Sequence, residues 1–286
     1  MPCKLRLGTA RDPKTASYAA IRGHHGAGCA GRNADVGQSR FRGPSRSGNG
    51  GYVCGRIAEY ADTPVTVTLR QPPPLATPMT VGQDAEGSLR VHDGHTLIAE
   101  AAPAPVPLAL ETPGPVSMAD AHTAAGHARY VHDSPFPGCF VCGVSRPPGD
   151  GLRIFPGPVP GRGLWAAPWT PDASVSDADG RVWAEVAWAA LDCPSGIAAA
   201  EGAGLGQDTA IVLGRMTASL WELPASGDQC RVIAWPDGVS GRKLTAGSAL
   251  LGSGGEVLAL AEAVWLTVPR PGPAPAADAA QAGGAR

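Results

Sequence analysis

A tight glycine turn followed by an alternating strand occurs twice in this sequence, and the repeat constrains the fold more than any other feature. Residues 93–101 read DGHTLIAEA, and residues 254–263 read GGEVLALAEA with one residue inserted. A glycine turn between alternating segments is a β-hairpin signal, and the same signal at two places indicates an internal duplication. We therefore expect two related units.

Each hairpin ends a series of β-like segments that follows one helix-like segment. The first helix is expected at 50–61 and the second at 181–193, where Pro194 and Gly196 should end it. The apolar patterns predict strands at 64–70, 76–81, 88–91 and 96–102 in the first unit, and at 210–221, 229–235, 242–251 and 256–268 in the second. One helix followed by an antiparallel meander, twice, predicts an α+β fold and disfavours a dinucleotide-binding domain.

The length of the chain allows this duplication, because 286 residues can form one large core or two cores of roughly 100–150 residues each. Within the connector between the units, a short helix is expected between 117 and 130. Shifts in composition divide the chain into five predicted segments. They are a disordered basic extension (1–40), a first unit (41–102), a Pro/Ala-rich connector (103–137), a second unit (138–268) and a disordered tail (269–286).

Composition and charge exclude several classes of protein. Hydrophobic residues make up 43% of the chain, the formal net charge is −2, and no apolar segment approaches the ~20 residues of a membrane span. We therefore expect a soluble protein with no nucleic-acid and no membrane partner, although ten Lys and Arg residues lie before residue 57. Seven scattered cysteines, an odd number, argue against a disulfide framework and favour the reducing cytoplasm.

Three segments resemble the double hotdog thioesterases: GNGGYVCGRIAEYA at 48–61, PVTVTLRQPPPLATPMTV at 64–81 and GRKLTAGSALLGSGGEVLALAEAVWL at 241–266. The resemblance extends over residues 41–268 and implies a tandem hotdog fold, in which two helices are each wrapped by a curled antiparallel sheet. It also implies an acyl-thioester hydrolase without a dissociable cofactor, whose partner is acyl-CoA or an acyl carrier protein. The implied assembly is a monomer with internally paired units, or a homodimer.

The resemblance also implies where the chemistry takes place. In the family, acyl-thioester sites lie near the helix termini where two units pair, and related two-domain acyl-CoA thioesterases carry an Asp early in the strand after the second helix. Here residues 211–217 contain no Asp, and Asp208 lies just upstream. The missing strand carboxylate and the absence of His after residue 132 favour an alternative function, a non-catalytic acyl-CoA-binding or interaction module on the same fold.

The turn Asn49-Gly50-Gly51-Tyr52 opens the first helix and is the first candidate site. Asn is a favoured N-cap, and the first N–H groups of a helix have no partner inside it. We predict that the N–H groups of Gly50 and Gly51 bind the thioester carbonyl oxygen. Asn49 would orient the substrate or a water molecule, and Tyr52 would contact the substrate. The alternative is a plain helix cap whose glycines are tolerated in a turn.

Asp192 is the candidate catalytic carboxylate, because it lies late in an otherwise apolar helix. Burial would raise its pKa toward that of a useful general base. Glu185 lies about two helical turns earlier and is expected on the same face. The alternatives are an Asp that faces solvent and an Asp bonded to the turn formed by Ser195 and Gly196.

Cys139 and Cys142 form a CxxC pair in the segment PFPGCFVCGV. Two thiols in a structural turn are our first interpretation. A zinc site is the alternative, because this spacing lets two thiolates reach one tetrahedral ion, and His132 is near enough in sequence to be a third ligand. Cys54 and Cys193, on the two helices, are interpreted as small core residues.

Overall fold

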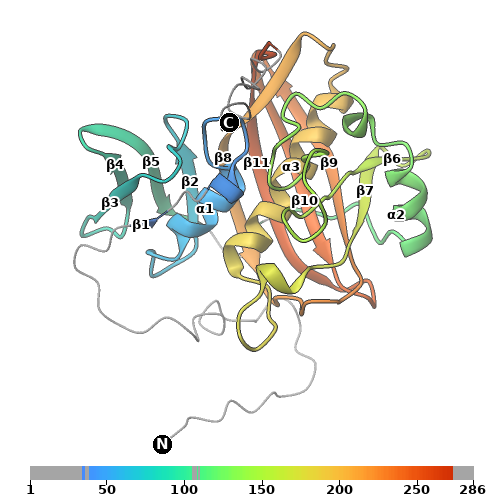
Figure 1. The fold of residues 1–286 in the computed structure, drawn as a ribbon, viewed down its shortest axis with the longest axis horizontal. Helices are drawn as coiled ribbons and strands as arrows, with labels where there is room; N and C mark the ends of the chain where they lie inside the picture. Colours follow the sequence, from blue (N-terminus) through green and yellow to red (C-terminus); the bar gives the residue numbers. More distant parts are fainter. Residues whose placement is uncertain (1–33, 36–38, 105–107, 109, 273–286) are drawn as a thin grey trace, which may run out of the picture.

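One antiparallel sheet runs through the part of the chain that the structure describes. The structure is a computed structural model, and it describes residues 34–35, 39–104, 108 and 110–272. The sheet has eleven strands in the order β1-β3-β4-β5-β2-β8-β11-β10-β9-β7-β6 (Figure 1). The strands are β1 (Ala34–Asp35), β2 (Val65–Leu69), β3 (Pro78–Gln83), β4 (Leu89–Asp93), β5 (Thr96–Pro103), β6 (Gly157–Val159), β7 (Leu164–Trp169), β8 (Thr209–Leu220), β9 (Cys230–Ser240), β10 (Lys243–Leu251) and β11 (Val257–Pro269).

Six helical segments accompany the sheet in the described residues. They are the α-helices α1 (Gly50–Ala58), α2 (Met118–Ala125) and α3 (Ala184–Gly202), and the short 3-10 helices η2 (Ser39–Phe41), η3 (Arg129–Val131) and η4 (Ala173–Val175). No helix in this part of the chain combines the length and the apolar character needed to cross a membrane. The predicted extension at 1–40 and the predicted tail at 269–286 lie mostly outside the described residues.

The strands predicted after each helix are confirmed. Strands β2 to β5 follow α1, and strands β8 to β11 follow α3. Both glycine-turn hairpins are present, as β4–β5 and β10–β11, and the helix expected in the connector is α2. The α+β class predicted from the sequence is therefore correct. Strands β6 and β7 were not predicted, because Pro158 and Pro168 interrupt their pattern.

The two units join edge to edge within one chain. Strand β2 of the first unit pairs with β8 of the second, with Thr66 opposite Thr217 and Val67 opposite Met216. The hydroxyl oxygens of Thr66 and Thr217 lie 2.8 Å apart and share a hydrogen bond across this junction. The junction makes the sheet continuous and brings α1 beside α3 (Figure 1).

In the part of the sheet that belongs to the second unit, neighbouring residues of a strand point into two different cores. In β9, Val232 and Ala234 belong to the main core together with α3, whereas Ile233 belongs to a smaller core together with α2. Successive strand residues face opposite sides of a sheet, so α3 and α2 cover opposite faces. Because both faces are buried, the strands of this part read as continuous apolar segments.

Helix α3 continues to Gly202, so the prediction that Pro194 and Gly196 end it is wrong. Pro194 lies inside the helix and has no N–H to donate to the preceding turn. The prediction failed because it weighed only local propensity, whereas α3 is buried along nearly its whole length against the sheet and α1. Tertiary packing of this kind supplies most of the stability of a helix in a protein.

Hydroxyl groups stabilise the helix next to Pro194. The Ser248 hydroxyl of β10 donates to the backbone carbonyl of Leu191 at 2.8 Å, and the Ser195 hydroxyl donates to the backbone carbonyl of Asp192 at 2.7 Å. The indole N–H of Trp265, on β11, donates to Ser195 Oγ at 3.0 Å. The sheet therefore holds this turn of α3, and with it the position of Asp192.

Two glycines of α1 allow α1 and α3, which are far apart in the sequence, to pack closely together. A Cβ atom at Gly51 would lie 2.4 Å from Asp192 Cβ and 2.8 Å from the backbone oxygen of Trp188. A Cβ atom at Gly55 would lie 2.6 Å from Glu185 Cα. These distances are too short for real carbon atoms, so a side chain at either position would push α1 away from α3.

We expect Gly55→Ala to lower the free energy of unfolding by about 1–3 kcal/mol, although alanine favours a helix over glycine by about 1 kcal/mol. The clash is with backbone atoms of α3, which cannot rotate away. Urea denaturation of the two proteins measures the difference. The matched control is Gly206→Ala, because a Cβ atom there would meet open space; its effect should stay within about 0.5 kcal/mol. Equal effects of the two substitutions would contradict the packing argument.

Candidate functional site

Asn49 connects the start of α1 to the middle of α3. Its side-chain oxygen accepts a hydrogen bond from the Tyr52 N–H at 2.9 Å, which confirms the predicted N-cap. Its side-chain nitrogen donates to Asp192 Oδ2 at 2.8 Å. Asn49 is 2% exposed and Asp192 is 1% exposed, so this contact is fully inside the protein. The structure therefore brings the two predicted polar residues together at the interface between the units.

Burial dominates the chemistry of Asp192. Loss of solvent raises the pKa of its carboxyl group to about 7, although the Gly51 N–H and the Asn49 amide act in the opposite direction. The Gly51 N–H lies close enough to the carboxylate to lower this pKa, whereas Asp192 Oδ1 has no hydrogen-bond partner of good geometry among the described residues. The alternative of a solvent-facing Asp192 is wrong. The Ser195 hydroxyl donates to the backbone carbonyl of Asp192 and not to its carboxylate.

The remaining residues of the turn lie in different surroundings. The Gly51 N–H faces Asp192, and the Gly50 N–H has no hydrogen bond within the described residues. The Tyr52 ring is buried and stacks on Phe41, with 4.0 Å between ring centroids, and Phe140 packs edge-on against both. Contact between Tyr52 and a substrate stays a prediction, and the ring has a clear packing role.

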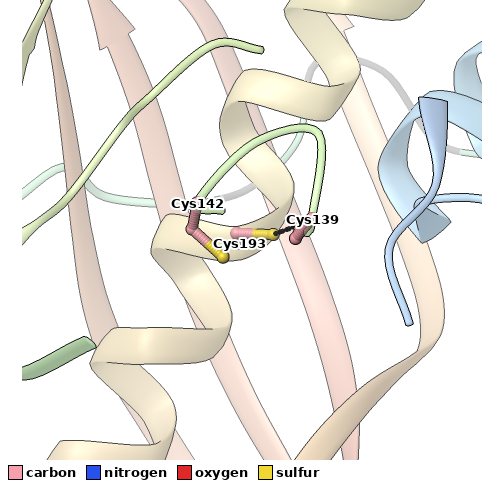
Figure 2. A group of neighbouring side chains, drawn as sticks. All are labelled: Cys139, Cys142 and Cys193. Carbon is pink, nitrogen blue, oxygen red and sulfur yellow. Dashed lines mark hydrogen bonds between the residues drawn. The ribbon is translucent and has the colours of Figure 1, made fainter. Parts of the chain in front are cut away.

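Three cysteines lie close together (Figure 2), next to the pair formed by Asn49 and Asp192. Cys139 and Cys142, on a loop, and Cys193, on α3, have sulfur atoms that all lie within 4.8 Å of one another. The sulfur atoms of Cys139 and Cys193 are 3.6 Å apart. His132 is exposed and lies outside the group, so its expected place as third ligand is taken by Cys193.

The interpretation of Cys193 as a small core residue missed this group. Cys193 is only partly buried, and its sulfur points to the loop that carries the CxxC pair (Figure 2). No spacing rule relates a helical cysteine to a CxxC pair so far away in the sequence. Hydrogen bonds from Cys142 and Cys193 lower the pKa of the Cys139 thiol. The pKa values of the Cys142 and Cys193 thiols are raised.

Two other carboxylates that the sequence suggested lie elsewhere. Glu185 is buried on α3 and forms an ion pair with Arg56 of α1, with 3.3 Å between Glu185 Oε1 and Arg56 Nη1. Asp208 is exposed and precedes β8. Neither has a hydrogen bond to Asn49 within the described residues. Asp192 is thus the carboxylate that meets the start of α1.

The site is closed in this structure. Two surface cavities, of about 210 and 540 Å³, are lined by other residues, the first around Trp169 and the second around Asp208. The loop with Cys139 and Cys142 passes beside α3 (Figure 2), and Asn49 Nδ2 lies 3.9 Å from Cys139 Sγ. Because Asp192 is 1% exposed, a ligand reaches it only after neighbouring side chains move.

Comparison with solved structures gives the fold. The tesB protein of Mycobacterium avium subs paratuberculosis matches with a TM-score of 0.54 and 14% identity, over 79% of this chain and 89% of that one. A thioesterase from Haemophilus influenzae matches over 45% of this chain and 85% of that one, with a TM-score of 0.39 and 14% identity. An acyl-ACP thioesterase from Bacteroides thetaiotaomicron matches over 37% of this chain and 46% of that one, with a TM-score of 0.33 and 20% identity. No protein-family model and no curated protein sequence matches the chain.

The match to the tesB protein covers most of both chains, so this chain has the double hotdog fold of hotdog thioesterases. The resemblance found in the sequence is thereby confirmed at the level of the fold. A likeness at 14% identity concerns the arrangement of strands and helices. The chemistry has to be argued from the residues at the interface of the units.

We expect Asn49→Ala to lower the free energy of unfolding by about 2–4 kcal/mol, the sum of a lost helix cap and a buried carboxylate left without its partner. The matched control is Ser117→Ala, which removes the cap of α2, where the Ser117 hydroxyl accepts from the Asp120 N–H at 3.0 Å on the surface. That change should cost only about 1 kcal/mol. Urea denaturation measures both. Similar costs would mean that the bond to Asp192 contributes nothing to stability.

Proposed function

We propose that the protein hydrolyses acyl thioesters, with Asp192 as general base. The hydrogen bond of 2.8 Å between Asn49 Nδ2 and Asp192 Oδ2 carries this proposal, because it places a buried carboxylate at the N-terminus of α1, across the interface of two hotdog units. The other oxygen, Oδ1, is buried and has no hydrogen-bond partner in the described residues, so a water molecule admitted when the site opens can bond to it. A pKa of about 7 leaves part of the group ionised at neutral pH.

In the proposed reaction, Asp192 takes a proton from a water molecule while the water oxygen attacks the thioester carbonyl carbon. The Gly50 N–H and the positive end of α1 stabilise the negative charge that develops on the carbonyl oxygen. The C–S bond then breaks, and the leaving sulfur receives the proton from Asp192. One carboxylic acid and one thiol are formed, and no cofactor takes part.

The double hotdog fold supports acyl-CoA or an acyl carrier protein conjugate as the substrate class. The arrangement of the units supports a single chain as the working form, because α1 and α3 meet within one molecule through the β2–β8 junction. Asn49 comes from the first unit and Asp192 from the second. The proposed site is thus complete without a second copy.

We expect Asp192→Asn to reduce hydrolysis of acyl-CoA by at least about 100-fold, because the amide cannot accept the proton of the attacking water. A panel of acyl-CoA substrates of increasing chain length, followed by release of free thiol, measures the rate. Asparagine has almost the same shape as aspartate, so the fold should be retained and circular dichroism should be unchanged.

Asp208→Asn is the matched control, because Asp208 is the acid just upstream of the strand that carries the Asp in related thioesterases, yet it is exposed and has no hydrogen bond to Asn49 within the described residues. Its activity should equal that of the wild type. A folded wild-type protein that binds acyl-CoA without turning over any chain length would refute hydrolysis and select the non-catalytic acyl-binding module. The closed state of Asp192 is the observation that favours this second function.

A further inference from the structure

The three-cysteine group stands outside the proposed hydrolysis, and nothing in that reaction uses it. Its members come from two distant segments, the loop with Cys139 and Cys142 and the middle of α3 with Cys193 (Figure 2). The other described cysteines, Cys54 and Cys230, are buried and lie outside the group. Three thiols that converge in this way need a physical explanation.

The spacing of the sulfur atoms fits one tetrahedral metal ion. Thiolates bind Zn²⁺ at about 2.3 Å, so two of them on one tetrahedral ion lie roughly 3.8 Å apart. The sulfur atoms of Cys139 and Cys193 are 3.6 Å apart, and all three lie within 4.8 Å of one another. Small side-chain rotations are enough to bring the third sulfur to the same distance.

An amide donor faces two of the sulfur atoms, and the Asp192 carboxylate lies 3.9 Å from Cys193 Sγ. Asn49 Nδ2 lies 3.9 Å from Cys139 Sγ and 3.7 Å from Cys193 Sγ, at distances of N–H···S hydrogen bonds. Such outer hydrogen bonds orient metal ligands and balance their charge. The N-terminus of α1, where the helix dipole is positive, starts at the same Asn49.

We propose that Cys139, Cys142 and Cys193 bind one Zn²⁺ ion. Thiolate ligands select soft or borderline ions, which distinguishes this site from one for Mg²⁺ or Ca²⁺. Cys193 is the least buried of the three, and a solvent molecule beside it would complete the tetrahedron. The ion fastens the loop to α3, in the manner of a structural crosslink between two distant segments.

Titration of the reduced, metal-free full chain with Co²⁺ tests the site. The expected result is one equivalent bound, with a thiolate-to-cobalt charge-transfer band in the near ultraviolet and the visible bands of tetrahedral cobalt, both abolished by added Zn²⁺. Zn²⁺ should also raise the melting temperature, because it binds the folded protein at a preformed site. These readouts do not depend on thioester hydrolysis, so this proposal can fail while the proposed function holds, and the reverse.

Single Cys→Ala variants assign the ligands. Loss of Cys139, Cys142 or Cys193 should each weaken Co²⁺ binding by more than roughly 100-fold, because removal of even an outer-shell partner costs about 10–100-fold. Cys230→Ala is the matched control for a buried thiol, and a variant without Cys3 and Cys29, which lie outside the described residues, controls for the N-terminal cysteines. Both should bind like the wild type.

Two results would overturn the proposal. One is a reduced wild-type protein that shows no cobalt charge-transfer band and no shift in melting temperature with Zn²⁺. The other is binding that persists in the Cys142→Ala and Cys193→Ala variants but disappears when Cys3 and Cys29 are replaced. Because the first result is obtained on the unmodified chain, the test stands even if one of the variants fails to fold.

Discussion

The close approach of α1 to α3 is the constraint on which the rest of the structure depends. Gly51 and Gly55 face α3 without side chains, and a Cβ atom at either position would overlap atoms of Asp192 or Glu185. Because the helices touch, the N-cap of one helix can reach the carboxylate of the other. Gly51, which the sequence suggested as part of an oxyanion site or of a plain helix cap, and Gly55 are thus packing residues, and the site is a consequence of the contact they allow.

The second requirement is that α3 remain a helix through Pro194. If the helix ended at Cys193, as local propensity predicts, Asp192 would lie in a fraying last turn with access to water. Instead, Ser248 of the sheet bonds the Leu191 carbonyl, and Trp265 holds the Ser195 hydroxyl. The sheet therefore stabilises a turn of α3 that the local sequence around Pro194 disfavours. This turn carries both Asp192 and Cys193.

The sequence allowed prediction of the features that depend on short-range pattern. The strand alternation, the two glycine hairpins and the Asn49 cap are local signals, and each is present in the structure. The course of α3 beyond Pro194 depends on side chains from β10 and β11, and the meeting of Cys193 with the CxxC loop depends on how that loop crosses α3. No local pattern contains either fact. The burial of Asp192 lies between these cases, because an apolar helix suggested it and only packing on both sides makes it complete.

Burial gives Asp192 its proposed reactivity and also closes the path to it. A carboxyl group in water has a pKa of about 4 and is a weak base, whereas loss of solvent raises the pKa of Asp192 to about 7. α1, α3 and the sheet cannot open this site without breaking the glycine contact or the β2–β8 pairing. The loop with Cys139 and Cys142 is held as well, because the Phe140 N–H donates to the Arg42 carbonyl and the Leu152 N–H to the Phe140 carbonyl. An ion bound by the three thiols would fasten the same loop to α3 more firmly.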